Sequence, residues 1–164
     1  MTSLDRFEDV VRRAHLVSDS SGADPSDVEE PELHPFETRN IHPDLPAKIR
    51  KLYDDGYYPE AAFEAFKYVE KEVKRIAGTR GLTGNKLMMA VFNEQSPMIH
   101  LNGMATDSDK DEQFGYRYIF AGAQSGIRNP RGHETDLTDS PDLCLDHLSL
   151  ASILLRKLDD AGVR

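Results

Sequence analysis

An arginine and a histidine lie five residues apart in the last third of this chain, at Arg128 and His133. Arginine is a permanent cation whose planar guanidinium binds phosphate oxygens. Histidine takes and gives protons near neutral pH. Together these two side chains form a minimal set for cleaving RNA without a metal ion. The spacing by itself is a weak signal, because such pairs also arise by chance.

A purely structural interpretation of the same residues stays open. The residue before a proline avoids the α-helical region, so Asn129 is predicted to mark the end of a helix over 109–127. Arg128 would then lie at a helix C-terminus, where it can bind free carbonyl groups. His133 would lie in the following turn and form hydrogen bonds within the loop. The context of the motif must decide between the two interpretations.

Composition sets the general class of protein. With 164 residues, 38% of them hydrophobic and 30% charged, the chain is expected to form one soluble domain with a core of its own. No apolar run approaches a membrane span, and the polar N-terminus has no apolar stretch of the signal-peptide kind. We therefore expect a cytoplasmic protein without membrane contact. A single cysteine, Cys144, excludes an internal disulfide and a multi-cysteine zinc site, and neither a cofactor nor a metal is expected.

The charge of the chain is acidic but unevenly distributed. The formal net charge is −9, which argues against a protein that coats nucleic acid non-specifically. Residues 1–35 carry 9 acidic and 3 basic side chains, whereas residues 36–164 carry 20 and 17. The body is therefore only mildly acidic. A local basic cleft remains compatible with the sequence, although no basic track is evident along it.

The chain divides into two parts at about residue 40. An amphipathic helix is predicted over 4–17, and the Ser-, Asp-, Glu- and Pro-rich residues 18–35 read as a linker. We therefore assign residues 1–40 to an N-terminal helix with an acidic flexible linker, and residues 41–164 to a helical domain.

Apolar periodicity and end signals predict a bundle of four to five helices in the body. The expected helices cover residues 44–55, 59–77, 84–93, 109–127 and 141–161, with Ser108 as the cap of the fourth and a short strand at 98–101. In the helix over 109–127, Phe114, Tyr118, Ile119 and Ala123 are expected to face inward. In the last helix, Leu145, Leu148, Ile153, Leu154 and Leu158 are expected to form the buried stripe. The predicted fold class is all-α, with the extra N-terminal helix and its linker.

An ordered set of short segments then gives the context that the motif lacks. Over residues 41–158 the chain resembles the Ymh family, a group of helical domains without a known activity. The segments that carry the resemblance are Ile41-His42-Pro43, Asp55-Gly56-Tyr57-Tyr58-Pro59-Glu60-Ala61, Ala65-Phe66-Lys67, Gly84-Asn85-Lys86-Leu87-Met88, Phe120-Ala121-Gly122-Ala123, Gly126-Ile127-Arg128-Asn129-Pro130 and His133.

The Ymh family in turn resembles the HEPN superfamily, and this resemblance implies a function. HEPN ribonucleases carry an arginine, an adjacent polar residue and a histidine a few positions later, which Arg128, Asn129 and His133 match. The resemblance implies a HEPN-like bundle and a homodimer in which two motifs form one cleft around RNA. It implies catalytic roles for Arg128, Asn129 and His133, and a setting in phage defence or a toxin–antitoxin pair with a possible regulatory protein partner.

Three further residues are candidates for substrate binding. Glu60, Glu64 and Lys67 share one face of the helix over 59–77. Two interpretations of this face stay open: it borders the implied cleft, or it is a solvated face with i,i+4 pairs. The leading hypothesis is a metal-independent endoribonuclease. The alternative is a non-catalytic dimeric helical module that binds RNA, a nucleotide or a partner protein; the acidic balance of the chain favours that alternative, and the intact Arg–Asn–His set favours catalysis.

Overall fold

The structure is a computed structural model that describes residues 33–134 and 136–164, and its compact helical unit runs from His34 to Arg164. The described residues contain no strand, so this part of the chain is all-helical. The helix predicted over 4–17, like residues 18–32 of the predicted linker, lies outside the described residues. The elements are α2 (Pro35–Thr38), α3 (Ala47–Asp54), α4 (Tyr58–Ala77), α5 (Gly84–Val91), α6 (Asp107–Ala123), the π-helix η2 (Gln124–Arg128), α7 (Asn129–His133) and α8 (Pro141–Asp160).

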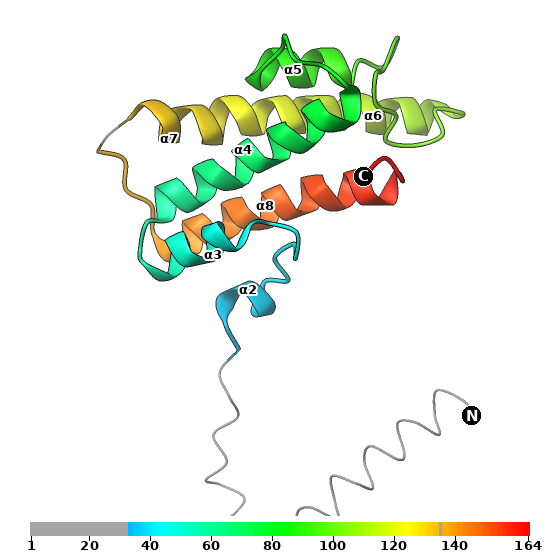
Figure 1. The fold of residues 1–164 in the computed structure, drawn as a ribbon. Helices are drawn as coiled ribbons and strands as arrows, with labels where there is room; N and C mark the ends of the chain where they lie inside the picture. Colours follow the sequence, from blue (N-terminus) through cyan, green and yellow to red (C-terminus); the bar gives the residue numbers. More distant parts are fainter. Residues whose placement is uncertain (1–32, 135) are drawn as a thin grey trace, which may run out of the picture. The chain divides into compact units, whose positions relative to one another are not determined.

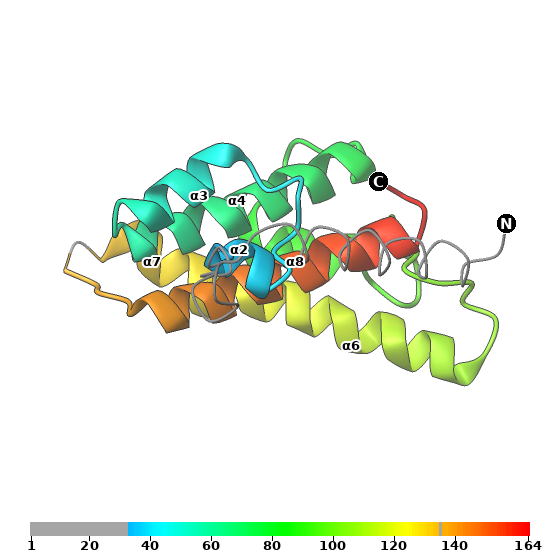
Figure 2. The ribbon, with the colours of Figure 1, turned by 90° about the horizontal axis from the view of Figure 1, so that it is seen from below.

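Helix α4 is the centre of the bundle. Pro59 occupies its first turn, and Gly78 ends it in the left-handed conformation with φ +63°, as the sequence predicts. The helix contacts α3, α5, α7, α8 and η2. In Figure 1, α4 crosses between α6 and α8, and its first turn lies at the same end of the bundle as α7. Figure 2, turned by 90°, shows α3 and α4 on the opposite side of α8 from α6.

The loop between α5 and α6 is organised by a buried glutamine rather than by a strand. The Gln113 side chain accepts a hydrogen bond from the backbone N–H of Leu101 at 2.9 Å. It donates to the carbonyl oxygens of Phe92 at 3.2 Å and Ile99 at 3.0 Å. Because one amide side chain satisfies these backbone groups, the segment needs no pairing with another strand. The strand predicted over 98–101 is therefore wrong, although Ile99 and Leu101 are buried.

Gln113 also sets which face of α6 is buried, and here the predicted stripe is largely wrong. The buried residues of the helix are Gln113, Phe120, Ala121 and Ala123. Phe114, Tyr118 and Ile119 are 44%, 49% and 44% exposed, and only Ala123 of the predicted set faces inward. Because the polar Gln113 lies on the inward face, a prediction from apolar periodicity alone selects a different face of α6, which is exposed to solvent.

Local end signals mark the two long C-terminal helices. Thr106, and not Ser108, caps α6: its side chain accepts from the Asp109 N–H while the Asp109 carboxylate accepts from the Thr106 N–H. Ser140 caps α8 as predicted, by accepting from the Leu143 N–H. Along α8 the other residues of the predicted stripe are buried, but Ile153 is 50% exposed. No helix in the described part of the chain has both the length and the hydropathy of a membrane span.

Candidate functional site

Arg128 lies in a continuous helical run, not at a helix end. After α6 the backbone widens into the π-helix η2, and α7 follows directly. Asn129 is helical, with φ −65° and ψ −47°, so the predicted boundary at this residue is wrong. Pro130 has no N–H and its ring crowds the carbonyl four residues earlier. A wider π turn, in which the Asn129 N–H bonds to the Gln124 carbonyl, lets the helical run pass through the proline.

Side chains from neighbouring helices hold the π turn in place. The buried Gln124 side chain donates to the Phe66 carbonyl of α4 at 3.2 Å. From α5, Asn85 donates to the Ser125 hydroxyl at 3.0 Å and to the Ala121 carbonyl at 3.4 Å. These two positioning residues were missed at the level of sequence. For Gln124, the sequence feature that could have predicted this role is its position between the apolar Ala123 and Ile127. No comparable sequence feature marks Asn85.

The Arg128 side chain packs against the ring of Phe63 in α4. The guanidinium carbon lies 5.3 Å from the centroid of the Phe63 ring, within the range of a cation–π contact. Its Nη1 donates to the Asn129 side-chain oxygen at 3.1 Å. The Arg128 Nε is buried and has no hydrogen-bond partner among the described residues. A buried donor without a partner is costly, which makes this atom a candidate for binding an acceptor brought by a ligand.

Helix α7 is fixed against α4 and against the segment that follows it. A Cβ added at Gly132 would come within 2.8 Å of the Phe63 ring, so only glycine allows this close approach. Arg131 donates from Nε to Asp139 at 2.7 Å and from Nη2 to the same carboxylate at 2.8 Å. It also donates to the Ile127 carbonyl at 3.0 Å. Both partners of this pair are buried, so α7 has one defined orientation.

His133 is the last residue of α7 and is exposed. The described residues offer its ring no hydrogen bond. Five residues at about 100° per residue separate the directions of His133 and Arg128 by roughly 140° around a helix. The structure therefore places Arg128 and Asn129 in contact at the junction of η2 and α7, and it leaves His133 exposed at the end of α7.

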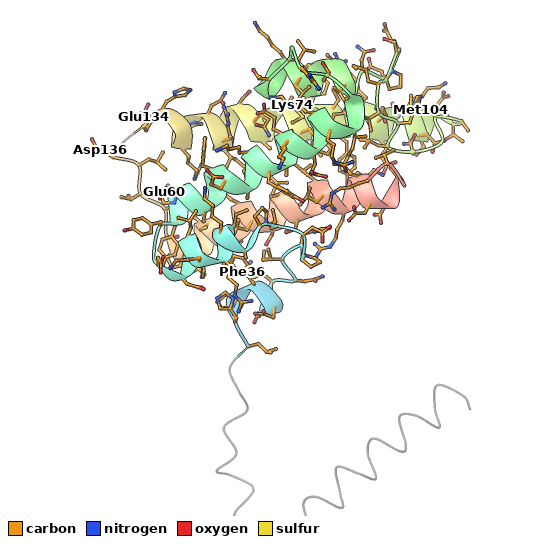
Figure 3. The ribbon with its side chains drawn as sticks, in the orientation of Figure 1. Phe36, Glu60, Lys74, Met104, Glu134 and Asp136 are labelled. Carbon is orange, nitrogen blue, oxygen red and sulfur yellow. The ribbon has the colours of Figure 1, made fainter. Side chains whose placement is uncertain are left out.

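A cavity of about 530 Å³ lies between α3, α4 and the end of η2. Arg128 lines it together with Lys48, Lys67, Lys71 and Lys74, and two carboxylates, Glu64 and Glu70, share the lining. The position of this basic cavity could not be predicted from the sequence, because its cations come from separate helices. Of the residues predicted to bind substrate, Glu64 and Lys67 line the cavity. Glu60 is exposed near the start of α4, outside the lining, whereas Lys74 lies much further along the helix (Figure 3).

Glu64 is held between two of these lysines. Its carboxylate oxygen lies 3.1 Å from the Lys48 Nζ and 3.2 Å from the Lys67 Nζ. Burial alone raises the pKa of Glu64, but the hydrogen bonds from the two lysines outweigh burial and leave that pKa below its usual value. Glu64 is therefore ionised at neutral pH and orients the lysines.

Other chemistry is weak in the described part of the chain. In it, no group of three or more His, Cys, Asp or Glu residues is arranged to hold a metal ion. Cys144 is buried, and burial raises the pKa of its thiol to about 12, so it is not a thiolate nucleophile at neutral pH.

Comparison with known proteins gives a family but no activity. A family model described as "Protein of unknown function (Hypoth_ymh)" matches residues 39–158, well over half of the chain. The chain belongs to the Ymh family. The match includes the cavity, η2 and the residues of α7, so the candidate site of this Ymh protein lies within the family's common region. No curated protein and no solved structure matches the chain.

Proposed function

We propose that this Ymh protein is a metal-independent endoribonuclease of the HEPN type, acting in the cytoplasm in phage defence or in a toxin–antitoxin pair. The observation that carries the proposal is the placement of Arg128. Among the described residues its Nε is a buried donor without a partner, and the side chain lines a cavity with four lysines. An RNA phosphate brings the acceptor and the negative charge that this arrangement lacks. His133, five residues on, supplies an imidazole as the proposed proton-transfer group.

The chemistry follows from the side chains and from the RNA itself. The ribose 2′-hydroxyl attacks its own 3′-phosphate, and a neutral His133 takes the hydroxyl proton. Arg128 stabilises the charge on the five-coordinate phosphorus. The phosphorus–oxygen bond to the next nucleotide breaks, and a protonated histidine gives its proton to the leaving 5′-oxygen. The products are a 2′,3′-cyclic phosphate and a free 5′-hydroxyl, and Asn129 orients Arg128 through the hydrogen bond between them.

Two histidines around one phosphate require a second copy of the chain. Since Arg128 lines the cavity and the exposed His133 does not, a homodimer would combine residues from both copies at each phosphate. The exposed face of α6 suits this contact, because Phe114, Tyr118 and Ile119 are about half exposed there. Gly115, Gly122 and Gly126 lie in the same helical run without positive φ and without any neighbouring atom near an added Cβ. Each costs about 0.5–1 kcal/mol relative to alanine, which the close approach of a second backbone would explain.

We expect the dimer to dissociate when Ile119 is replaced by glutamate, because the change places a carboxylate in the proposed apolar contact. Light scattering at micromolar concentration measures the result. Ile153→Glu is the matched control, since Ile153 is exposed to a similar degree on α8. If the wild type is a monomer, the proposed dimer is wrong. If only the Ile153 variant dissociates, the contact between the copies lies on α8 instead of α6.

We expect RNA cleavage to persist in EDTA and to leave 2′,3′-cyclic phosphate or 3′-phosphate ends, because the proposed reaction uses only protein groups and the 2′-hydroxyl. Total RNA incubated with the protein, with mapping of the product ends, tests both points. DNA of the same sequence serves as the control and should stay intact. Activity that appears only with added magnesium, or equal cleavage of DNA, would show that the mechanism is wrong.

A second function, a non-catalytic dimeric module that binds RNA, a nucleotide or a partner protein, has one observation in its favour. Arg128 lies in the cavity and His133 does not, so one copy by itself brings no proton-transfer group to the bound phosphate. RNA binding without cleavage by a protein that is dimeric in solution would favour this function. A regulatory protein that covers the cavity is compatible with either function.

A further inference from the structure

Glu70 stands apart from the other residues of the cavity. It lines the cavity between α3 and α4, yet only 5% of its surface is exposed. Its Oε1 accepts a hydrogen bond from the Lys74 Nζ at 2.6 Å. Its Oε2 is buried and has no partner among the described residues. A buried carboxylate oxygen without a donor is costly, and the proposed phosphate chemistry makes no use of it.

Two residues that line the cavity each carry a buried polar atom without a partner among the described residues, Arg128 at its Nε donor and Glu70 at its Oε2 acceptor. Arg128 lies over Phe63, and Glu70 is seven residues further along the same helix, a rise of about 10 Å. At one end the cavity therefore offers a cationic donor, and at the other a carboxylate acceptor. Lys71, the residue after Glu70 on α4, also lines the cavity; it is exposed and forms no ion pair with any described carboxylate. A ligand that fits both ends is an anion that also carries N–H or O–H donors at a distance from its charge.

We propose that this cavity is a pocket for a nucleoside phosphate: Arg128 and the lysines bind its phosphate, and Glu70 accepts a hydrogen bond from its base or ribose. The volume of about 530 Å³ is in the range of pockets that enclose a small molecule. Rotation of the Glu70 carboxylate about its soft terminal torsion brings either oxygen toward the ligand. The binding itself does not depend on cleavage. Only the position of this nucleotide next to a scissile phosphate rests on the proposed ribonuclease function.

The competing explanation is that Glu70 and Lys74 form a structural i,i+4 ion pair and nothing more. The two explanations differ in what Glu70→Gln does. The substitution keeps the shape of the side chain but removes the charge that attracts a donor. A pocket residue would lose affinity for the nucleoside part of a ligand and keep affinity for phosphate. A structural pair would lose stability and leave binding of every ligand unchanged.

The test is calorimetric titration of the full chain with the four ribonucleoside 3′-monophosphates, ribose 5-phosphate and inorganic phosphate. We expect Glu70→Gln to weaken nucleoside phosphate binding about ten-fold or more, as for a lost hydrogen bond to a charged group, with no change for inorganic phosphate. Lys71→Ala should weaken all three classes of ligand, and it keeps the test decisive if the Glu70 variant does not fold. The exposed Glu60→Gln is the matched control and should bind like the wild type.

A trinucleotide with 2′-O-methyl groups, which cannot be cleaved, identifies the source of the nucleotide. Binding at least ten-fold tighter than a mononucleotide points to an RNA strand, and the reverse order points to a free nucleotide. The inference is overturned if the wild type binds no nucleotide at millimolar concentration, or if Glu70→Gln and Lys71→Ala both bind like it. Because neither ligand is cut, these results are independent of whether the protein cleaves RNA.

Discussion

Replacing His133 by alanine is expected to lower the rate of RNA cleavage about 10²–10⁴-fold, the usual contribution of general acid–base catalysis. His133 is exposed at the end of α7, and the described residues give it no hydrogen bond that its loss would break. Stability should therefore change by no more than about 0.5 kcal/mol. Single-turnover cleavage and the melting temperature, measured on the same preparation, test both expectations.

Two substitutions of Arg128 distinguish the effect of its positive charge from the effect of its planar geometry. Arg128→Ala should lower the rate about 10²–10³-fold by removing a preorganised charge stabiliser. Arg128→Lys should also fail, because an ammonium lacks the planar fork and the same stacking on Phe63. The contrary result would be near-normal cleavage with a large loss of stability in the alanine variants. It would identify Arg128 as a packing residue and favour the binding module.

The largest loss of stability is expected from Asp139→Ala. Asp139 and Arg131 are joined by two hydrogen bonds, and their side chains are only 3% and 7% exposed. Removing the carboxylate leaves a buried guanidinium without its counter-charge, which typically costs about 3–5 kcal/mol. Urea unfolding followed by circular dichroism measures this change.

An exposed ion pair provides the control for Asp139. The Lys110–Asp107 pair has a similar contact distance of 3.1 Å, but the Asp107 side chain is 98% exposed. Asp107→Ala should leave the unfolding midpoint unchanged. If Asp139→Ala is equally silent, the Arg131–Asp139 pair does not hold α7. A loss of cleavage in the Asp139 variant would then require a direct role for that carboxylate.

The parts of the fold that could be predicted from sequence are those fixed by local chemistry. Pro59 lies in the first turn of α4, where a backbone N–H has no partner within the helix, so its missing N–H costs nothing. Gly78 ends the helix because glycine tolerates a positive φ. Ser140 starts α8 because its hydroxyl accepts from an N–H of the first turn. Leu87, Met88 and Val91 of α5, and Phe92 directly after it, are buried. None of these features depends on where the rest of the chain lies.

The parts that could not be predicted depend on contacts between distant residues. Gln113 and Gln124 are buried because backbone groups of other segments need their amides, and a hydrophobic pattern treats both as surface residues. The cavity joins Lys48 of α3 to Arg128 of η2 across 80 positions of sequence. Asn129 was assigned to a helix end because Pro130 disfavours a regular helix, but a π turn offers an alternative to termination.

The π turn also changes the angle between the side chains of α6 and those of α7, which an uninterrupted α-helix would fix at about 100° per residue. A π-helix advances more residues per turn than an α-helix, so η2 introduces a phase shift between the side chains of α6 and those of α7. With an uninterrupted α-helix from Asp107 to His133, the direction of His133 would be dictated by that of Ile119. With η2 between them, the direction of His133 relative to the exposed apolar face of α6 is offset from the one that a regular α-helix would give. The π turn therefore sets the angle between that face and His133.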